Sequence, residues 1–151
     1  MVSESLADEL SDDAIVLNAD ATDWRAAVRL AGAALTATGS TTEEYTAEMI
    51  QAVEELGPYI VVAPGIALAH SRPSPAVLST GISWVALASP VEFGHSANDP
   101  VRLVVGLAAV DHDSHLSTMS NLAGVLSGDL DRLLGASDPE ELRALIRENS
   151  Q

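Results

Sequence analysis

The sequence predicts a single-domain α/β protein in which one mixed sheet is covered by helices on both faces. Two observations support this fold class. Apolar runs of strand length alternate with amphipathic helical segments, and the 151-residue length is typical of one domain. A sheet between two helical layers lets both kinds of element bury their apolar sides. Because a helical pair separates the first strand from the others, we expect strands of both directions.

Four apolar runs are expected to form the sheet. They are residues 14–17 (AIVL), 59–63 (YIVVA), 80–88 (TGISWVALA) and 103–109 (LVVGLAA). The last is apolar throughout, as expected of a strand whose two faces are both covered. After the second run, three prolines and a glycine within twelve residues predict a fixed, non-helical path.

Two helices are predicted between the first and second runs. Apolar residues over 24–37 recur at spacings of three and four, and Thr22 precedes them as an N-cap. A second helix is predicted over 41–56. There Glu44 follows Thr41 at the spacing of a capping box.

The last third of the chain is predicted to be helical. Asp113 or Ser114 can cap a helix whose apolar face combines Leu116, Met119, Leu122, Ala123 and Leu126. A short turn (DLDRLL) follows. A closing helix is predicted next. Asp138 is its N-cap, Pro139 its first residue and Glu141 its third.

Charge and composition exclude several classes of partner. The chain has 22 acidic residues against seven arginines, no lysine and a formal charge of −15. Nucleic acids and anionic membrane surfaces are bound through excess positive charge, so neither is expected. A basic protein partner fits better, although a salt-adapted surface would look the same.

Cysteine is absent, which excludes disulfides and thiolate metal sites. The N-terminus has no basic segment followed by an apolar one, and no run of about 18 apolar residues occurs. We therefore expect a cytoplasmic protein. We divide it into an acidic, solvated segment over 1–13 and one domain over 14–151.

Histidines are the strongest candidates for chemistry, and all four are predicted in loops or at the ends of elements. His70 stands in ALAHSRP, directly after an apolar run and a Pro-Gly turn, and beside Arg72. His112 and His115 are spaced HxxH at the start of a predicted helix. That position suits phosphate binding through free amides and the helix dipole.

Two other readings of these residues remain open. His70, His112 and His115 could together hold a metal ion, as in a metal hydrolase, although no HExxH pattern is present. A Ser-His-Asp hydrolase is disfavoured because the sequence has no GxSxG elbow. For a single loop histidine, a solvated surface position is the default expectation.

The stretch GPYIVVAPGIALAHSRP resembles the active-site segment of enzyme IIA domains of the bacterial sugar phosphotransferase system. Within the mannitol-fructose superfamily it is most similar to the ascorbate-type branch. The similarity continues through GISWVALASPVEFGHSANDPVRLVVGLAAVDHDSHLSTMSNLAGVL and extends weakly to a DPEEL element. It covers about residues 14–148. Two departures are Ala69, where proline is usual, and Glu54, near which mannitol-type relatives carry an arginine.

The resemblance implies a phosphocarrier with a three-layer α/β/α fold. It implies that His70 is phosphorylated by phospho-HPr and that a cysteine of an enzyme IIB component is the acceptor, with the membrane component IIC served indirectly. It also implies that His115 supports the phosphoryl group, and no metal or cofactor is expected. Arg72 and Ser114 are our candidates for stabilising the phosphate.

The same resemblance is compatible with a regulatory protein that signals through its phosphorylation state. We expect the ring nitrogen of His70 that does not react to be held by a backbone carbonyl or an acidic side chain. We also expect an open site with an apolar collar, to which Ile66, Leu68 and Pro73 could contribute.

Overall fold

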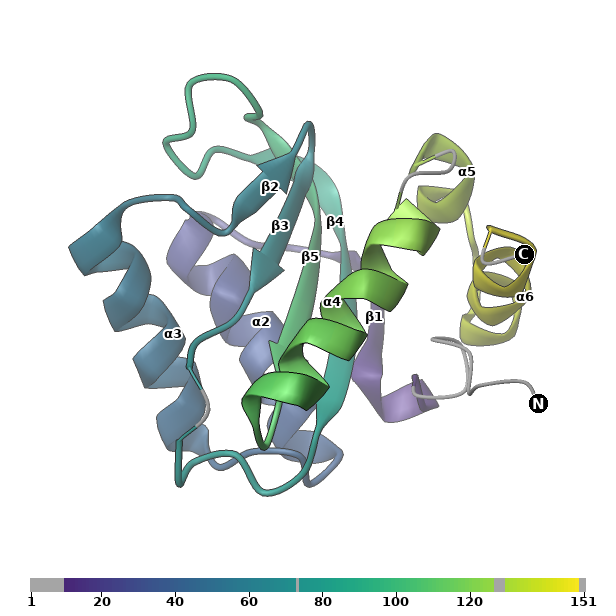
Figure 1. Cartoon of the computed structure of the whole chain (residues 1–151). Helices are drawn as coiled ribbons and strands as arrows, with labels where there is room; N and C mark the ends of the chain where they lie inside the picture. The colour runs from purple at the N-terminus through teal and green to yellow at the C-terminus, as the bar shows by residue number, and fades with distance from the viewer. Residues whose placement is uncertain (1–9, 73, 127–129, 150–151) are drawn as a thin grey trace.

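The structure, a computed structural model, describes residues 10–72, 74–126 and 130–149, the side chains of 112, 114, 115, 148 and 149 excepted. A five-stranded sheet lies between two layers of helices (Figure 1). The strands are β1 Ile15–Ala19, β2 Val61–Ala63, β3 Ile66–Ala69, β4 Gly81–Val91 and β5 Val101–Ala108. The helices are the 3-10 turn η1 Asp12–Ala14, α2 Trp24–Ala37, α3 Glu43–Leu56, α4 His112–Leu126, α5 Leu130–Leu134 and α6 Pro139–Asn149.

The sheet is mixed, as predicted, with the strand order β1-β4-β5-β3-β2. β1 runs parallel to β4 and β3 runs parallel to β5, whereas the β4–β5 and β2–β3 pairs are antiparallel. Ala69, the last residue of β3, lies opposite Gly106 near the end of β5. The segments that leave β3 and β5 therefore start from the same end of the sheet, where both strands have their C-termini.

Each face of the sheet has its own apolar core. Val104 and Ala108 of β5 belong to the cluster formed with α2 and α3. Leu103, Val105 and Leu107 of the same strand belong to the cluster formed with α4, α5 and α6. Because successive residues of a strand point to opposite faces, β5 serves both cores, and this explains its apolar run from Leu103 to Ala108. The three-layer α/β/α fold is confirmed.

One strand was not predicted. Residues 66–69 form β3, which pairs with β2 through a tight turn at Gly65. Gly65 has a φ of 80°, a conformation that side chains disfavour, so glycine is needed at this turn. The prolines and glycine around this segment predicted a fixed, non-helical path, and the strand agrees with that. The strand itself was not among the four predicted runs.

The helix boundaries were predicted better than the caps. α2 spans the predicted residues, but its cap is Asp23, whose carboxylate accepts the Ala26 amide at 2.8 Å, and not Thr22. α3 begins after Thr42, which makes no side-chain cap bond, so the capping box at Thr41 does not form. The α6 prediction is confirmed, since Asp138 accepts the amide of Glu141 at 2.7 Å.

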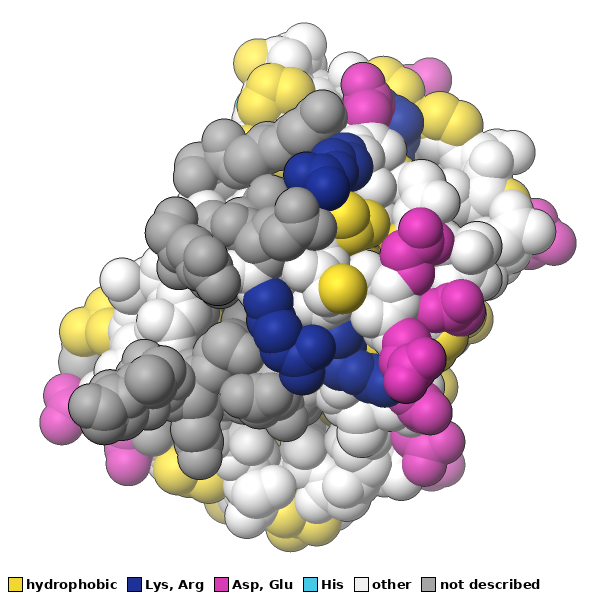
Figure 2. All heavy atoms as spheres, turned by 90° about the vertical axis from the view of Figure 1, so that its right-hand side faces the viewer, with side chains coloured by type: hydrophobic (Ala, Val, Ile, Leu, Met, Phe, Trp, Pro, Cys, Tyr) yellow, Lys and Arg dark blue, Asp and Glu magenta, His cyan; other side chains and the backbone are white. Residues whose placement is uncertain are grey.

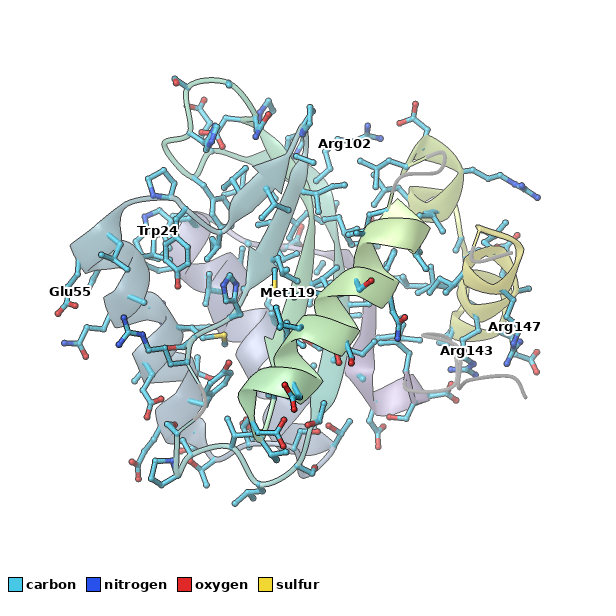
Figure 3. The ribbon with its side chains drawn as sticks, in the orientation of Figure 1. Trp24, Glu55, Arg102, Met119, Arg143 and Arg147 are labelled. Carbon is cyan, nitrogen blue, oxygen red and sulfur yellow. The ribbon has the colours of Figure 1, made fainter. Side chains whose placement is uncertain are left out.

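The start and the buried face of α4 differ from the prediction. The helix begins at His112, so Asp113 and Ser114 lie inside its first turn and do not precede it. Leu116 and Ala123 are exposed, and the buried positions are Thr118, Leu122 and Val125. Met119 is partly buried and packs between α4 and the sheet (Figure 3).

The N-terminal segment is not fully solvated. Leu10 is buried in the core beside α6, although Asp12 and Asp13 are exposed as predicted. Arg143 of α6 holds this segment by an ion pair to Asp12 at 2.8 Å and a bond to the Leu10 carbonyl oxygen. Figure 2 shows arginines on the α5–α6 side of the molecule with acidic side chains bordering them.

Candidate active site

His70 is the first residue after β3, and its imidazole is half-buried. Its Nδ1 lies 2.7 Å from the carbonyl oxygen of Leu68. A carbonyl oxygen can only accept a hydrogen bond, so Nδ1 carries the proton. Nε2 then keeps its lone pair. The expected backbone carbonyl partner is therefore present, and it selects one tautomer.

The surroundings of His70 keep the ring neutral. Burial lowers its pKa below the usual 6.5, because a charged imidazolium loses solvation there. The bond to the Leu68 carbonyl acts in the opposite direction, since it favours the protonated ring, but it is the smaller effect. A neutral ring near pH 7 is the form that can attack phosphorus.

The loop after His70 is tied to the start of α3. The hydroxyl of Ser74 donates to the Glu48 carboxylate at 2.7 Å, and the amide of Thr42 donates to the Ala76 carbonyl at 2.9 Å. Thr41 and Val77 add an isolated β-bridge. These contacts confirm that the backbone around the proline-rich segment follows a fixed path.

Two tyrosines contact the backbone at this point. The hydroxyl of Tyr45 accepts the amide of Ser71 at 2.9 Å and lies 2.8 Å from the Leu107 carbonyl oxygen. The hydroxyl of Tyr59 donates to the His70 carbonyl at 3.1 Å. Neither hydroxyl was expected to have a role, because both tyrosines fitted the apolar pattern of their elements.

The helix that carries His115 starts close in sequence to the end of β5. Only residues 109–111 separate β5 from α4, and His115 is the fourth residue of that helix. Amides in the first turn of a helix have no partner within it and favour anions. The side chains of His112, Ser114 and His115 lie outside the described part of the structure, so the roles predicted for Ser114 and His115 stay predictions.

Arg72 is exposed and lies near the ring that contacts His70. Its positive charge lowers the pKa of Tyr59, against a larger upward effect of burial. Glu54, which stands where relatives were expected to carry an arginine, instead forms an ion pair with Arg25 of α2 at 2.9 Å. Arg72 therefore remains our candidate for stabilising a phosphate.

His95 has a structural position in the loop between β4 and β5. Its Nδ1 accepts the amides of Ala97 and Asn98 at 3.2 and 3.0 Å. Among the described residues, no three histidine, aspartate or glutamate side chains are gathered as metal ligands. The side chains of His112 and His115, which the metal hypothesis needs, are not among those residues.

The predicted apolar collar is different from the observed apolar surface. Ile66 and Leu68 are buried in the core and cannot contribute, and Pro73 lies outside the described residues. Large exposed apolar side chains are found instead at Leu56, Tyr59, Val62, Leu78, Val110 and Leu116.

A neutral imidazole whose Nδ1–H is held by the Leu68 carbonyl suits a class of protein that carries a group covalently on histidine. The comparisons identify the family. The model of the phosphoenolpyruvate-dependent sugar phosphotransferase system EIIA 2 family matches residues 9–149, so the chain belongs to this family. It is a phosphotransferase, a phosphocarrier for sugar uptake.

Curated relatives come from the ascorbate branch. The chain is 40% identical over 111 residues to the ascorbate-specific PTS system EIIA components of Escherichia coli K12 and Salmonella typhimurium. These alignments cover 73% of this chain and 72% of each relative. Among the described residues, no helix is long and apolar enough to cross a membrane.

Solved structures of mannitol-type IIA proteins share the fold. The mannitol-specific cryptic enzyme IIA of E. coli is 30% identical, with a TM-score of 0.83 over 96% of this chain and 99% of that one. The E. coli IIA mannitol protein has also been solved in complex with phosphorylated IIB mannitol. It is 27% identical, with a TM-score of 0.80 over 91% of this chain and 96% of that one.

Proposed function

We propose that Nε2 of His70 accepts a phosphoryl group from phospho-HPr and passes it to a cysteine of an enzyme IIB component in the cytoplasm, in support of a IIC transporter. The observation that carries this proposal is the bond from Nδ1 to the Leu68 carbonyl at 2.7 Å. It assigns the proton to Nδ1 and the lone pair to Nε2, and burial keeps the ring uncharged at neutral pH.

The two transfers follow from this tautomer. In the first, the Nε2 lone pair forms a bond to phosphorus while the N–P bond of the donor phosphohistidine breaks, and its electron pair stays on the donor nitrogen. In the second, a thiolate of IIB attacks phosphorus and the electron pair of the breaking N–P bond returns to Nε2. Nδ1–H stays on Leu68 throughout, and the carbonyl stabilises the positive charge that the ring gains when Nε2 is substituted.

Stabilisation of the transferring group is assigned to three groups. Phosphoryl transfer has a loose transition state, so catalysis consists mainly of positioning and of stabilising charge on the equatorial oxygens. His115, Ser114 with the amides of the α4 first turn, and Arg72 are proposed for this role. They offset the strongly acidic charge of the chain only locally. The acidic surface elsewhere suits docking to a basic patch on HPr.

The test is a reconstituted transfer with phosphoenolpyruvate, enzyme I, HPr and a IIB domain. We expect wild type to carry phosphate on His70, as located by mass spectrometry, and His70→Ala to take up none. His115→Ala should fold and take up phosphate but pass it on more slowly. Phosphate uptake by His70→Ala equal to wild type would reject the assignment of His70, and an unchanged onward rate would remove His115 from the site.

The names of the ascorbate-branch relatives suggest which sugar the partner transporter takes up. Because the curated relatives are named ascorbate-specific, we propose that the partner transporter takes up ascorbate or a related sugar acid. The test measures the rate of phosphoryl transfer from this protein to the IIB domains of ascorbate, mannitol and fructose systems. Faster transfer to a mannitol or fructose IIB than to an ascorbate IIB would contradict it.

A further inference from the structure

The chain has two tyrosines, and both hydroxyl groups end on the backbone of His70 and Ser71. They reach it from different places. Tyr45 lies in α3, 26 residues before Ser71, and Tyr59 lies 11 residues before His70, just ahead of β2. This convergence on two consecutive residues is a feature of the site that the phosphocarrier assignment does not by itself require.

Tyr45 connects the segment that leaves β3 to the end of β5. Its hydroxyl accepts the Ser71 amide at 2.9 Å, and its proton lies between two acceptors, the Leu107 carbonyl at 2.8 Å and the Ser71 carbonyl at 3.2 Å. Leu107 is the last residue but one of β5, which leads into α4. Tyr45 therefore ties the His70 segment to the strand from which the His115 helix starts.

The Tyr45 side chain is suited to a permanent connection. It is only 1% exposed, and burial raises its pKa to about 12. The phenol keeps its proton over the whole physiological range, so it can act as donor and acceptor together.

Tyr59 holds the other side of His70. Its hydroxyl donates to the His70 carbonyl at 3.1 Å, and its ring meets the imidazole with centroids 5.4 Å apart and planes at 78°. Such edge-to-face contacts restrict the rotation of both rings. Tyr59 is 39% exposed, so it does not belong to the core.

We propose that Tyr45 and Tyr59 are positioning residues for phosphoryl transfer, which fix the His70–Ser71 backbone so that Nδ1–H stays on Leu68 and Nε2 keeps the lone pair that reacts. This inference rests on the proposed function, because it assumes that His70 carries the phosphoryl group. It adds that the tautomer depends on two side chains outside the histidine pair.

A purely structural role makes a different prediction from a positioning role. If the hydroxyls serve only stability, their removal lowers the free energy of unfolding and leaves the ring signals of His70 unchanged. If they position His70, their removal lets the ring leave Leu68, and a second tautomer becomes visible. A loss of alignment of this kind can slow a transfer by tenfold to roughly a hundredfold.

The experiment compares Tyr59→Phe and Tyr45→Phe with Ser83→Ala. Ser83 is buried and donates to the Ala31 carbonyl at 2.9 Å, so its variant also loses a buried hydroxyl bond but leaves residues 70 and 71 untouched. Each protein is measured for unfolding in urea, for the His70 tautomer by ¹⁵N NMR and for the single-turnover rate of uptake from phospho-HPr. Tyr59→Phe serves on its own if Tyr45→Phe does not fold.

We expect both Tyr variants to slow phosphate uptake roughly tenfold and to show a mixed tautomer at His70, while Ser83→Ala keeps the wild-type rate and ring signals. Rates or ring signals equal to those of Ser83→Ala would overturn the inference, as would a slowed rate with a single unchanged tautomer. Those outcomes leave the proposed function intact. Failure of wild type to be phosphorylated at His70 would instead refute the proposed function itself.

Discussion

His70 and His95 occupy loops at the ends of strands, and both are half-buried, yet their rings are used in opposite ways. At His70, Nδ1 carries a proton and donates a hydrogen bond to the Leu68 carbonyl. At His95, Nδ1 carries a lone pair and accepts two amides. The comparison shows that the backbone partner of Nδ1 decides which ring nitrogen carries the lone pair. Backbone donors place the lone pair of His95 on Nδ1, whereas a backbone acceptor places that of His70 on Nε2, where we propose that it reacts.

The charges of the two loops differ in the same sense. The carboxylate of Asp99 accepts the amides of Phe93, Gly94 and His95 at distances of 2.7 to 3.0 Å, so the His95 loop is closed on itself by an anion. The His70 loop carries the exposed cation Arg72 instead. The charge of Arg72 favours a nearby phosphoryl group, whereas the charge of Asp99 disfavours one.

Replacing each histidine by glutamine gives the largest contrast. An amide has no nucleophilic lone pair on nitrogen, so His70→Gln should lose phosphoryl transfer by more than about a thousandfold. His95→Gln should keep the wild-type rate. Both rates are measured as single-turnover uptake of phosphate from phospho-HPr. Comparable losses in the two variants would end the distinction between the loops.

Removal of the Asp99 carboxylate should affect stability but not transfer. Asp99→Ala leaves three amides without their acceptor, and we expect it to lower the free energy of unfolding by about 1–3 kcal/mol. Urea denaturation measures the change, and the transfer rate of the folded variant serves as the control. A slowed transfer with unchanged stability would mean that the β4–β5 loop belongs to the active site.

The pH dependence of stability and of phosphate uptake should differ from that of a solvent-exposed histidine, because the pKa of His70 is lowered. Burial places its pKa below 6.5, so its ring stays neutral in the folded protein at pH values where the unfolded chain binds a proton. Stability linked to His70 is therefore full above pH 6.5 and is lost as pH falls through the folded-state pKa. Phosphate uptake should persist below pH 6.5, and an inflection at or above 6.5 in its pH profile would contradict the account.

Neutralising Arg72 should give the smallest effect. The side chain is exposed, where a single charge interaction is weak and screened by salt. Arg72→Gln should slow phosphate uptake by about threefold at low ionic strength and less at high ionic strength. The salt dependence of the rate in variant and wild type measures this. A wild-type rate at low salt would remove Arg72 from the site.

Sequence reasoning predicted the fold where periodicity and local chemistry agreed. The α6 start followed from Asp138 because a cap acts within three residues. β3 was missed because its four apolar residues lie between Gly65 and a cluster of prolines, and their pairing with β2 and β5 is not visible in the local sequence. Leu116 was placed on a buried face because its spacing fits, but its side chain is exposed.

The site was predicted in part. His70 followed from the motif around it, and a backbone partner for its ring was expected, although Leu68 was not singled out for that role. The hydroxyls of Tyr45 and Tyr59 could not be predicted, because their bonds to residues 70 and 71 depend on how α3 and the start of β2 pack against the loop. Local patterns do not carry that information.

The most direct test of the central claim is the identity of the phosphorylated atom. The ¹⁵N and ³¹P NMR spectra of the phosphorylated protein identify the bonded nitrogen through its coupling to phosphorus. The account predicts phosphorus on Nε2 of His70, with the proton still on Nδ1 beside Leu68. Phosphorus on Nδ1 of His70, or on another residue, would contradict it.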